Sequence, residues 1–128
     1  MSIAVEWDDE ERTILHYTFE SPWTWEEYHA AIARAWEMAA EVDHPTDTIT
    51  DMRNSRLLPD NVFRHVRQSM VEIPESTRTV VIVGAGMLVQ ALLNILRRVY
   101  RNQDGLFFTA ETLEEARELI YSRRETDS

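Results

Sequence analysis

The turn Gly84-Ala85-Gly86 is the segment of this sequence that comes closest to a chemical motif. It follows the apolar run 79–83 and opens a helical pattern, which is the setting in which backbone amides at a helix N-terminus bind a pyrophosphate. The third glycine of a dinucleotide-binding turn is missing, however, because its position holds Val89. The turn also comes late in the chain and not in the first strand–helix unit. We therefore expect a tight turn with a modest capacity for anions and no nucleotide site.

Histidines are the other residues that could ligate a metal or act as a general base, and the chain has four: His16, His29, His44 and His65. Their positions show none of the spacings typical of metal ligands, and none of them belongs to a motif with a nucleophilic serine. A catalytic triad that only the fold assembles stays open. The pattern predicts no catalytic residue, no metal site and no cofactor, and it favours a protein that is not an enzyme.

Lysine and cysteine are both absent from the 128 residues, so all 13 basic residues are arginines. This excludes Schiff-base lysines, thiol nucleophiles, disulfides and zinc–thiolate sites. The formal net charge is −10, and the first 50 residues, with 12 acids and 2 arginines, carry all of it. Such an excess of acid argues against binding to nucleic acid or to an anionic membrane. The acidic run 8–11 lacks the alternating carboxylates of a calcium loop and is expected to be a solvated hairpin tip.

Alternating hydrophobic residues on both sides of this tip predict two strands, and the rest of the chain alternates between helical and strand patterns. The first helix has a strong start signal, because Thr24 and Glu27 have the spacing of a capping box, and it should end before Pro45. Further strands are expected at 46–52, 79–83 and 106–108, and further helices at 59–73, at 87–101 and from Thr112 onward.

The resulting order, ββαβαβαβα, predicts an α/β domain with a mixed, mostly parallel sheet of about five strands and four helices. The chain shows no linker, so residues 1–122 should form a single domain, and the polar residues 123–128 should form a frayed C-terminal tail. The N-terminus lacks the basic and apolar segments of a signal peptide, which makes a cytoplasmic location the expectation.

Three segments carry a resemblance to a known family. Residues 48–53 (Thr-Ile-Thr-Asp-Met-Arg) give a strand that ends in an aspartate, residues 79–83 (Thr-Val-Val-Ile-Val) give the next strand, and residues 106–116 give the last strand and the start of the last helix. Together with the order of elements, they resemble the SpoIIAA-like, or STAS, family, which includes anti-anti-sigma factors and the cytoplasmic domains of anion transporters. The resemblance implies a STAS-like fold and a non-enzymatic role as an interaction or regulatory module.

The phosphorylation switch of that family would fall on Ser55. In anti-anti-sigma factors the phosphorylated serine follows an aspartate and precedes Ser-Gly, between this strand and the second helix. Here Asn54 precedes Ser55 and the Ser-Gly is missing, so the motif is absent as such. Arg53 and Arg56 are close in sequence and could pair with a phosphate. Ser55 is therefore the candidate phosphoacceptor, and the alternative is an ordinary solvated loop residue.

Aromatic residues are concentrated at 23–36, at Trp23, Trp25, Tyr28 and Trp36. Packing in the core would account for all four. Alternatively, they line a pocket between the first helix and the sheet, because small-molecule sites are mostly apolar. The candidate pocket residues are Trp25, Tyr28, Trp36, Met87 and Leu92, and the ligand would be small, apolar and lipid-like.

The helix expected at 87–101 is apolar over most of its circumference, so both of its sides must be covered. Its own chain could cover both sides, but we favour a homodimer, for which the candidate interface residues are Val89, Leu93, Leu96 and Tyr100. The sequence thus predicts a STAS-like interaction module that self-associates through this helix, with a binding module for a small apolar ligand as the alternative. A protein partner would face either the acidic first half or the arginine-rich second half.

Overall fold

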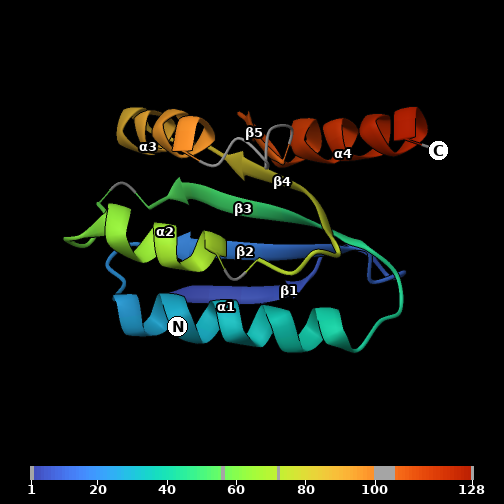
Figure 1. The fold of residues 1–128 in the computed structure, drawn as a ribbon, viewed down its shortest axis with the longest axis horizontal. Helices are drawn as coiled ribbons and strands as arrows, with labels where there is room; N and C mark the ends of the chain where they lie inside the picture. The colour runs from blue at the N-terminus through green and yellow to red at the C-terminus, as the bar shows by residue number, and fades with distance from the viewer. Residues whose placement is uncertain (1, 56, 72, 100–105, 128) are drawn as a thin grey trace.

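The computed structural model describes residues 2–55, 57–71, 73–99 and 106–127 of the chain. Strands and helices follow one another in the predicted order (Figure 1). The strands are β1 (Ile3–Trp7), β2 (Ile14–Glu20), β3 (Thr46–Asn54), β4 (Thr77–Val83) and β5 (Phe107–Ala110), and the helices are α1 (Trp25–Ala40), α2 (Val62–Val71), α3 (Met87–Val99) and α4 (Leu113–Asp127).

The strands form one five-stranded mixed sheet in the sequential order β1-β2-β3-β4-β5, which confirms the predicted α/β class. β1 and β2 form an antiparallel hairpin in which Ile3 pairs with Phe19 and Trp7 pairs with Leu15. β2, β3, β4 and β5 are parallel to one another. Neighbouring parallel strands need a crossover connection, which α1, α2 and α3 supply in turn. The carboxyl ends of β2 to β5 therefore share one edge of the sheet.

Three helices cover one face of the sheet, and α4 covers the other. Leu15, Tyr17 and Phe19 of β2 belong to the core cluster that contains residues of α1 and α3. Ile14, on the opposite face of β2, belongs to the cluster that contains Ala116 of α4. This alternation follows from the two-residue period of a strand. Figure 1 shows α1 and α4 on opposite sides of the strands.

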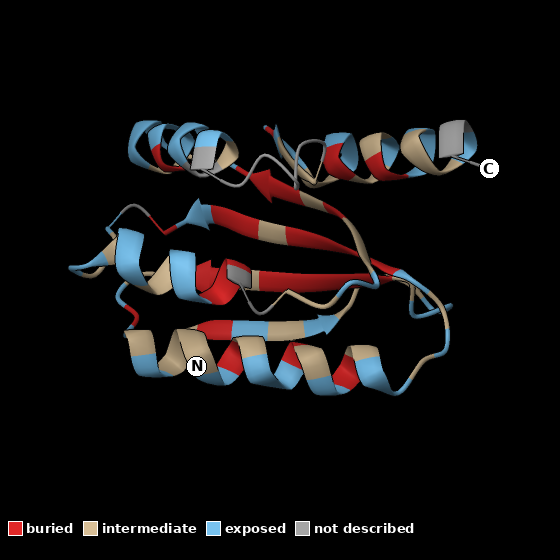
Figure 2. Cartoon of the chain, in the orientation of Figure 1, coloured by how far each residue is buried: buried red, intermediate tan, exposed pale blue. Residues whose placement is uncertain are grey.

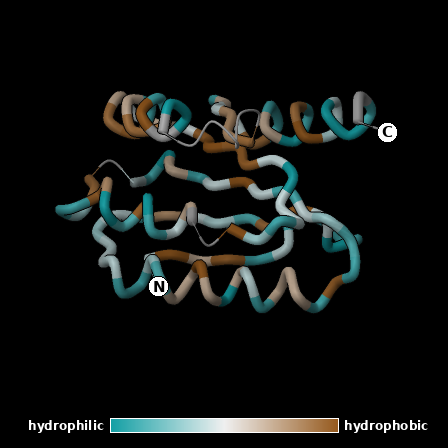
Figure 3. Tube along the Cα trace, in the orientation of Figure 1, coloured by the Kyte–Doolittle hydropathy of each residue, from teal (hydrophilic) through white to brown (hydrophobic). Residues whose placement is uncertain are grey.

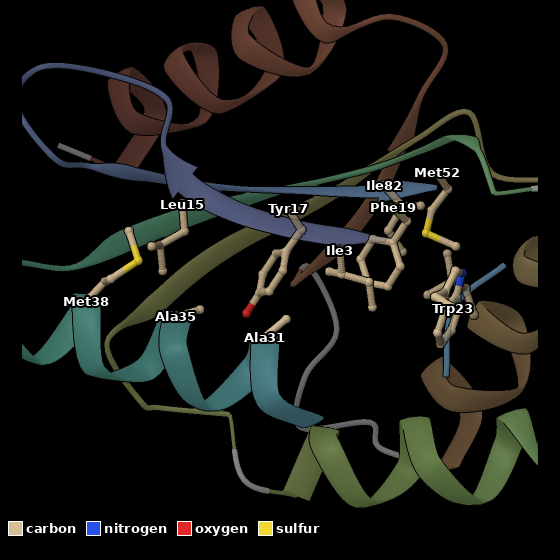
Figure 4. Close-up of a cluster of buried hydrophobic side chains, with 11 residues drawn as sticks. Ile3, Leu15, Tyr17, Phe19, Trp23, Ala31, Ala35, Met38, Met52 and Ile82 are labelled. Atoms are coloured by element: carbon tan, nitrogen blue, oxygen red, sulfur yellow. The ribbon is translucent and has the colours of Figure 1, made fainter. Parts of the chain in front are cut away.

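Helix α1 begins where the capping box predicts. The Glu27 backbone N–H donates to Thr24 Oγ1 at 3.1 Å, and the Thr24 N–H donates to the Glu27 carboxylate at 3.2 Å. The inner face of the helix carries Ala31, Ala35 and Met38, all buried. Figure 4 shows these side chains facing those of β2. Small residues on this face allow the helix to lie close to the sheet.

Burial is concentrated in the middle of the sheet, whereas the outer sides of the helices are exposed (Figure 2). The hydropathy of the residues follows this division only in part, because polar residues line much of α1 and α4 whereas α3 is largely hydrophobic (Figure 3). Ile14, Ile49, Val81 and Val83 are fully enclosed beneath α4. None of the helices in the described part of the chain has the length and apolarity needed to cross a membrane.

The C-terminal residues 123–127 belong to α4, so the prediction of a polar tail from residue 123 is wrong for these residues. Arg124 Nη2 donates to Asp47 Oδ2 at 2.6 Å and to Thr13 Oγ1 at 2.9 Å. Arg123 Nε donates to Thr79 Oγ1 at 3.2 Å. The polar composition of residues 123–128 could not show that these arginines bind buried groups at the amino ends of the strands. Arg124 neutralises Asp47, and Arg123 forms a hydrogen bond with Thr79.

The acidic hairpin tip is not uniformly solvated, which also corrects the sequence interpretation. Asp8 accepts two hydrogen bonds from the Arg117 guanidinium, each 2.8 Å long, and its side chain is 5% exposed. Asp9 accepts hydrogen bonds from the backbone N–H groups of Thr13 and Ile14 and so closes the turn. Two of the four carboxylates at the tip are thus structural.

Several element boundaries differ from the predicted ones. β4 begins at Thr77 and not at 79, and β5 spans Phe107–Ala110 and not 106–108. Two further differences have a clear cause. β3 continues to Asn54, because Asn54 pairs with Glu20 of β2 and accepts a backbone hydrogen bond from Ser21. α2 begins at Val62 and not at 59, because Asn61 adopts a positive φ of 67°, which no helical residue can have. Asn61 instead occupies the position before the helix, where its carbonyl accepts from the His65 N–H.

Candidate functional site

An apolar cavity of about 180 Å³ lies between the sheet and the three helices on its α1 side. β2, β3, β4 and β5 supply its floor, and α1, α2 and α3 supply its walls. The lining residues are Leu15, Tyr17, Phe19, Trp23, Trp25, Tyr28, Ile32, Trp36, Ala39, Thr48, Thr50, Met52, Leu58, Val62, Val66, Ser69, Met70, Ile73, Pro74, Thr77, Val80, Ile82, Val89, Leu92, Leu93 and Phe107. All of these side chains are uncharged.

Aromatic rings build the wall of the cavity near the start of α1. The rings of Trp23 and Trp25 meet edge to face with centroids 5.0 Å apart, and the Tyr28 ring lies 5.1 Å from Trp25. The Phe19 ring contacts Trp23 at 5.2 Å. Such contacts fix the ring orientations, so this part of the wall is preorganised.

The polar groups of the cavity lining are indole N–H groups, from Trp23, Trp25 and Trp36, and hydroxyls, from Tyr17, Tyr28, Thr48, Thr50, Ser69 and Thr77. Burial raises the pKa of the Tyr17 hydroxyl, and the neighbouring Tyr28 raises it further. Burial also raises the pKa of Tyr28, although a hydrogen bond with Ser69 partly opposes this. Both phenols are therefore neutral at physiological pH, and the cavity can offer hydrogen bonds but no charge.

Four of the five predicted pocket residues line this cavity: Trp25, Tyr28, Trp36 and Leu92. The fifth, Met87, is 90% exposed and lies outside it, so its inclusion was wrong. α3 begins at Met87 as predicted, but the apolar pattern of the helix did not reveal which of its sides faces the sheet. α2 contributes Val62, Val66, Ser69 and Met70, none of which the sequence interpretation included.

The predicted interface residues of α3 face inward where the structure describes them. Leu93 is 4% exposed, and Val89 and Leu93 both line the cavity. The side chain of Leu96 and residue Tyr100 lie outside the described part of the chain. The outer face of α3 exposes other apolar side chains, namely Met87, Leu88 and Ile95.

Ser55 is buried and not a solvated loop residue. It is 7% exposed, and its hydroxyl accepts a hydrogen bond from the Trp23 indole at 2.8 Å. Arg53 pairs with Asp51 through two hydrogen bonds of 2.9 and 2.8 Å, and Arg56 lies outside the described residues. The hydroxyl thus supports the aromatic wall, and a kinase could reach it only after this segment opens.

A pair of histidines joins α1 to α2 beside the cavity. His29 Nε2 lies 2.9 Å from His65 Nδ1, and the His65 ring stacks on Trp25 with centroids 4.3 Å apart. The sequence interpretation missed this pair, because the two residues are 36 positions apart on different helices. His29 directly follows Tyr28 of the aromatic wall, but nothing around His65 in the sequence indicates the contact.

A polar cluster occupies the opposite face of the sheet, under α4. His16 Nδ1 lies 3.0 Å from Asp8 Oδ1, and Asp8 is also held by Arg117, which lowers the pKa of the carboxyl. Arg53 likewise lowers the pKa of Asp51. His16 Nε2 is buried with no hydrogen-bond partner among the described residues. No group of three potential metal ligands is found in residues that the structure describes.

Comparisons of the chain with protein-family models, with curated proteins and with solved structures found no match.

Proposed function

We propose that this protein binds a small, uncharged, apolar molecule in the cavity between the sheet and helices α1, α2 and α3. The observation that carries the proposal is a cavity whose lining contains aromatic rings, aliphatic side chains and hydroxyls but no charged group. Ligand sites in proteins have this composition, with a few polar groups that orient the ligand. The sequence interpretation had this function as its alternative.

The volume limits the size of the ligand. An engineered protein cavity of about 150 Å³ binds benzene, so a cavity of about 180 Å³ suits a molecule of one or two small rings or a short chain. A full-length lipid tail is too large for it. A carboxylate or ammonium group inside the cavity would meet no side chain of opposite charge, which disfavours charged ligands.

Indole and indole-2-carboxylate form a matched pair of probes for this proposal. Isothermal titration calorimetry should show saturable binding of indole, and the carboxylate should bind at least about tenfold more weakly because its charge would be buried unpaired. The absence of heat with indole and with other neutral one-ring and two-ring molecules, such as toluene and phenol, would remove the proposal.

Substitutions at neighbouring positions of α2 locate the binding site. Val66 lines the cavity, whereas the next residue, Arg67, is exposed. Val66→Trp should fill the cavity and reduce indole affinity at least about tenfold. Arg67→Trp, which adds the same side chain on the outside, should leave the affinity unchanged. Circular dichroism of both variants verifies that they are folded.

A STAS-like identity fits this proposal. It is supported by the order ββαβαβαβα, by the sequential order of the strands and by the location of α4 on the face opposite the other helices. In such a regulatory module, binding of a ligand in the cavity would be the signal. α3 forms part of the cavity wall and also has an exposed outer face, so this helix would transmit the signal to another protein.

The second candidate function is self-association through the outer face of α3. Met87, Leu88 and Ile95 are 90%, 59% and 47% exposed, and Leu88 and Ile95, seven residues apart, share one side of the helix. Exposed apolar side chains in a row indicate a surface that another molecule covers. A second copy of this chain is the occupant that the sequence interpretation favoured.

Analytical ultracentrifugation tests this second candidate at micromolar concentration. The wild-type protein should sediment as a dimer, and Ile95→Arg should shift it to the monomer because the charge would be buried at the interface. Ala33→Arg, at an exposed position of α1 outside this face, is the control and should remain a dimer. A wild-type monomer would contradict self-association. Leu93→Arg is unsuitable, since Leu93 is buried within the domain and its substitution would unfold the protein.

A further inference from the structure

The contact between His29 and His65 lies where α1 meets α2, at the side of the cavity. Trp25 stacks on His65, and Ser69 Oγ donates to the His65 backbone oxygen at 3.0 Å. Trp25 and Ser69 both line the cavity. The histidine pair (His29 and His65) therefore connects the two helices through residues that form the cavity wall.

The hydrogen positions in the pair follow from its neighbours. Arg64 Nη2 lies 3.4 Å from His65 Nε2, and a guanidinium can only donate, so Nε2 is the accepting nitrogen. His65 then carries its hydrogen on Nδ1 and donates it to His29 Nε2 at 2.9 Å. Both imidazoles are neutral in this arrangement, and both nitrogens of His65 are engaged.

Each added proton removes one of these contacts. A proton on His29 Nε2 would face the Nδ1–H of His65, so these two donors would repel each other. If His65 moves its hydrogen from Nδ1 to Nε2, Nδ1 can accept from His29, but the Nε2–H then faces the Arg64 guanidinium. With both rings protonated, neither contact can form, and two positive charges lie beside a third. The complete set of contacts thus forms only in the neutral pair, and the contact between the two rings is lost when both are protonated.

Two charged side chains flank the pair on its own helices: Arg64 beside His65 on α2, and Glu26 three residues before His29 on α1. Arg64, on α2, is positive. On the α1 side, the aromatic rings of Trp25 and Tyr28 contact the imidazoles. In the preceding loop, Asp60 contributes its backbone oxygen, which accepts from the Trp25 indole at 2.5 Å. Among the ion pairs of the described residues, neither imidazole has a carboxylate partner, in contrast to His16.

We propose that the histidine pair is a proton-operated closure of the cavity, which holds α2 against α1 when both imidazoles are neutral and releases α2 when they are protonated. The release of ligand by acid rests on the proposed function, whereas the movement of α2 does not. The pKa of His65 is lowered, by desolvation and by the charges of Arg64 and His29, which agrees with this direction.

The sign of the pH effect follows from that direction. A lowered pKa in the closed form means that the closed form binds protons less well than the open form. The contact is therefore fully present above about pH 6.5, the value of a free histidine, and is lost as the pH falls through the lowered pKa. Acid should open the cavity, and neutral pH should close it.

The absence of cysteine allows two spin labels to be placed specifically, at Ala33→Cys on α1 and Gln68→Cys on α2, both exposed positions. Double electron–electron resonance on this labelled protein should show a longer and broader distance distribution at about pH 5 than at about pH 7.5. The variant His29→Gln/His65→Gln, which cannot be protonated at the pair, should show no difference. His44→Gln, a histidine outside the α1–α2 contact, should behave like the parent.

Two results would overturn the closure: equal distances at both pH values in the parent protein, or the same lengthening in the double glutamine variant. NMR titration of the imidazoles in the unlabelled wild-type protein tests the closure without any variant. A pKa of His65 at or above that of a free histidine would also overturn the closure. Indole affinity should fall about tenfold at the acid pH, the effect of one lost hydrogen bond. If indole binds at neither pH, the proposed function fails while the distances still decide the closure.

Discussion

Replacing Arg124 with alanine is expected to lower the free energy of unfolding by about 3–5 kcal/mol, which is the usual cost of removing one partner of a buried ion pair. Asp47 is 2% exposed, and Arg124 binds its carboxylate through Nε at 2.9 Å and Nη2 at 2.6 Å. Without the guanidinium, the carboxylate would remain buried and uncompensated. Urea unfolding followed by circular dichroism measures the loss.

A double-mutant cycle with Asp47→Asn separates the ion pair from the packing of the arginine side chain. In the Asp47→Asn background, Arg124→Ala should cost about 1 kcal/mol or less, because no buried charge is left unpaired. Arg34, exposed on α1, is the control for loss of an arginine, and Arg34→Ala should change stability by less than about 0.5 kcal/mol. An Arg124→Ala variant as stable as Arg34→Ala would show that the pair does not stabilise the fold.

Gly84→Ala is expected to lower the free energy of unfolding by about 3 kcal/mol. Alanine is strained in the left-handed region of backbone conformation, and its Cβ atom would overpack against Arg53. Gly84 has a φ of 71°, and a Cβ atom there would lie 2.5 Å from Arg53 Cγ and 3.0 Å from Arg53 Cα. The backbone atom cannot move without disturbing β3, whose Asp51 pairs with Val83. Thermal or urea unfolding of the variant measures this cost.

Gly86, two residues away in the same turn, is the matched control. A Cβ atom at Gly86 would have no neighbour within 4 Å. The Gly86 carbonyl accepts the first hydrogen bond of α3, a position where glycine is preferred to alanine, so Gly86→Ala should cost about 1 kcal/mol or less. Equal losses of stability in the two variants would contradict the prediction that the positive φ of Gly84 and its contact with Arg53 require glycine at this position.

The order of elements and the fold class could be predicted because they depend on signals within short segments. The capping box of Thr24 and Glu27 begins α1 as expected, and the continuous apolar run 79–83 lies in the interior of the sheet as β4. The beginning of α2 could not be predicted, since it depends on the positive φ of Asn61. A proline at 59 is compatible with the first turn of a helix, but the helix begins three residues later.

The site was only partly predictable. Trp25, Tyr28 and Trp36 were found because their helical spacing places them on the inner side of α1. Val66 and Ser69 of α2 were missed, because the recurrence of Val62, Val66 and Met70 marks an inner face of the helix but where that face docks on the sheet is not encoded locally. For α3, the sequence showed that two sides are apolar but not which side faces the sheet, so Val89 and Leu93 were assigned to the outside although they line the cavity.

The sequence by itself determined the α/β class, the order of the elements and the exclusion of lysine and thiol chemistry, because each depends on composition or on neighbours a few residues apart. The tertiary structure alone decided the cavity, the histidine pair and the ion pair of Asp47 and Arg124. The members of these pairs are 36 and 77 positions apart, so their contact depends on how helices dock on the sheet. That docking is set by the summed packing of many side chains, which no single segment contains.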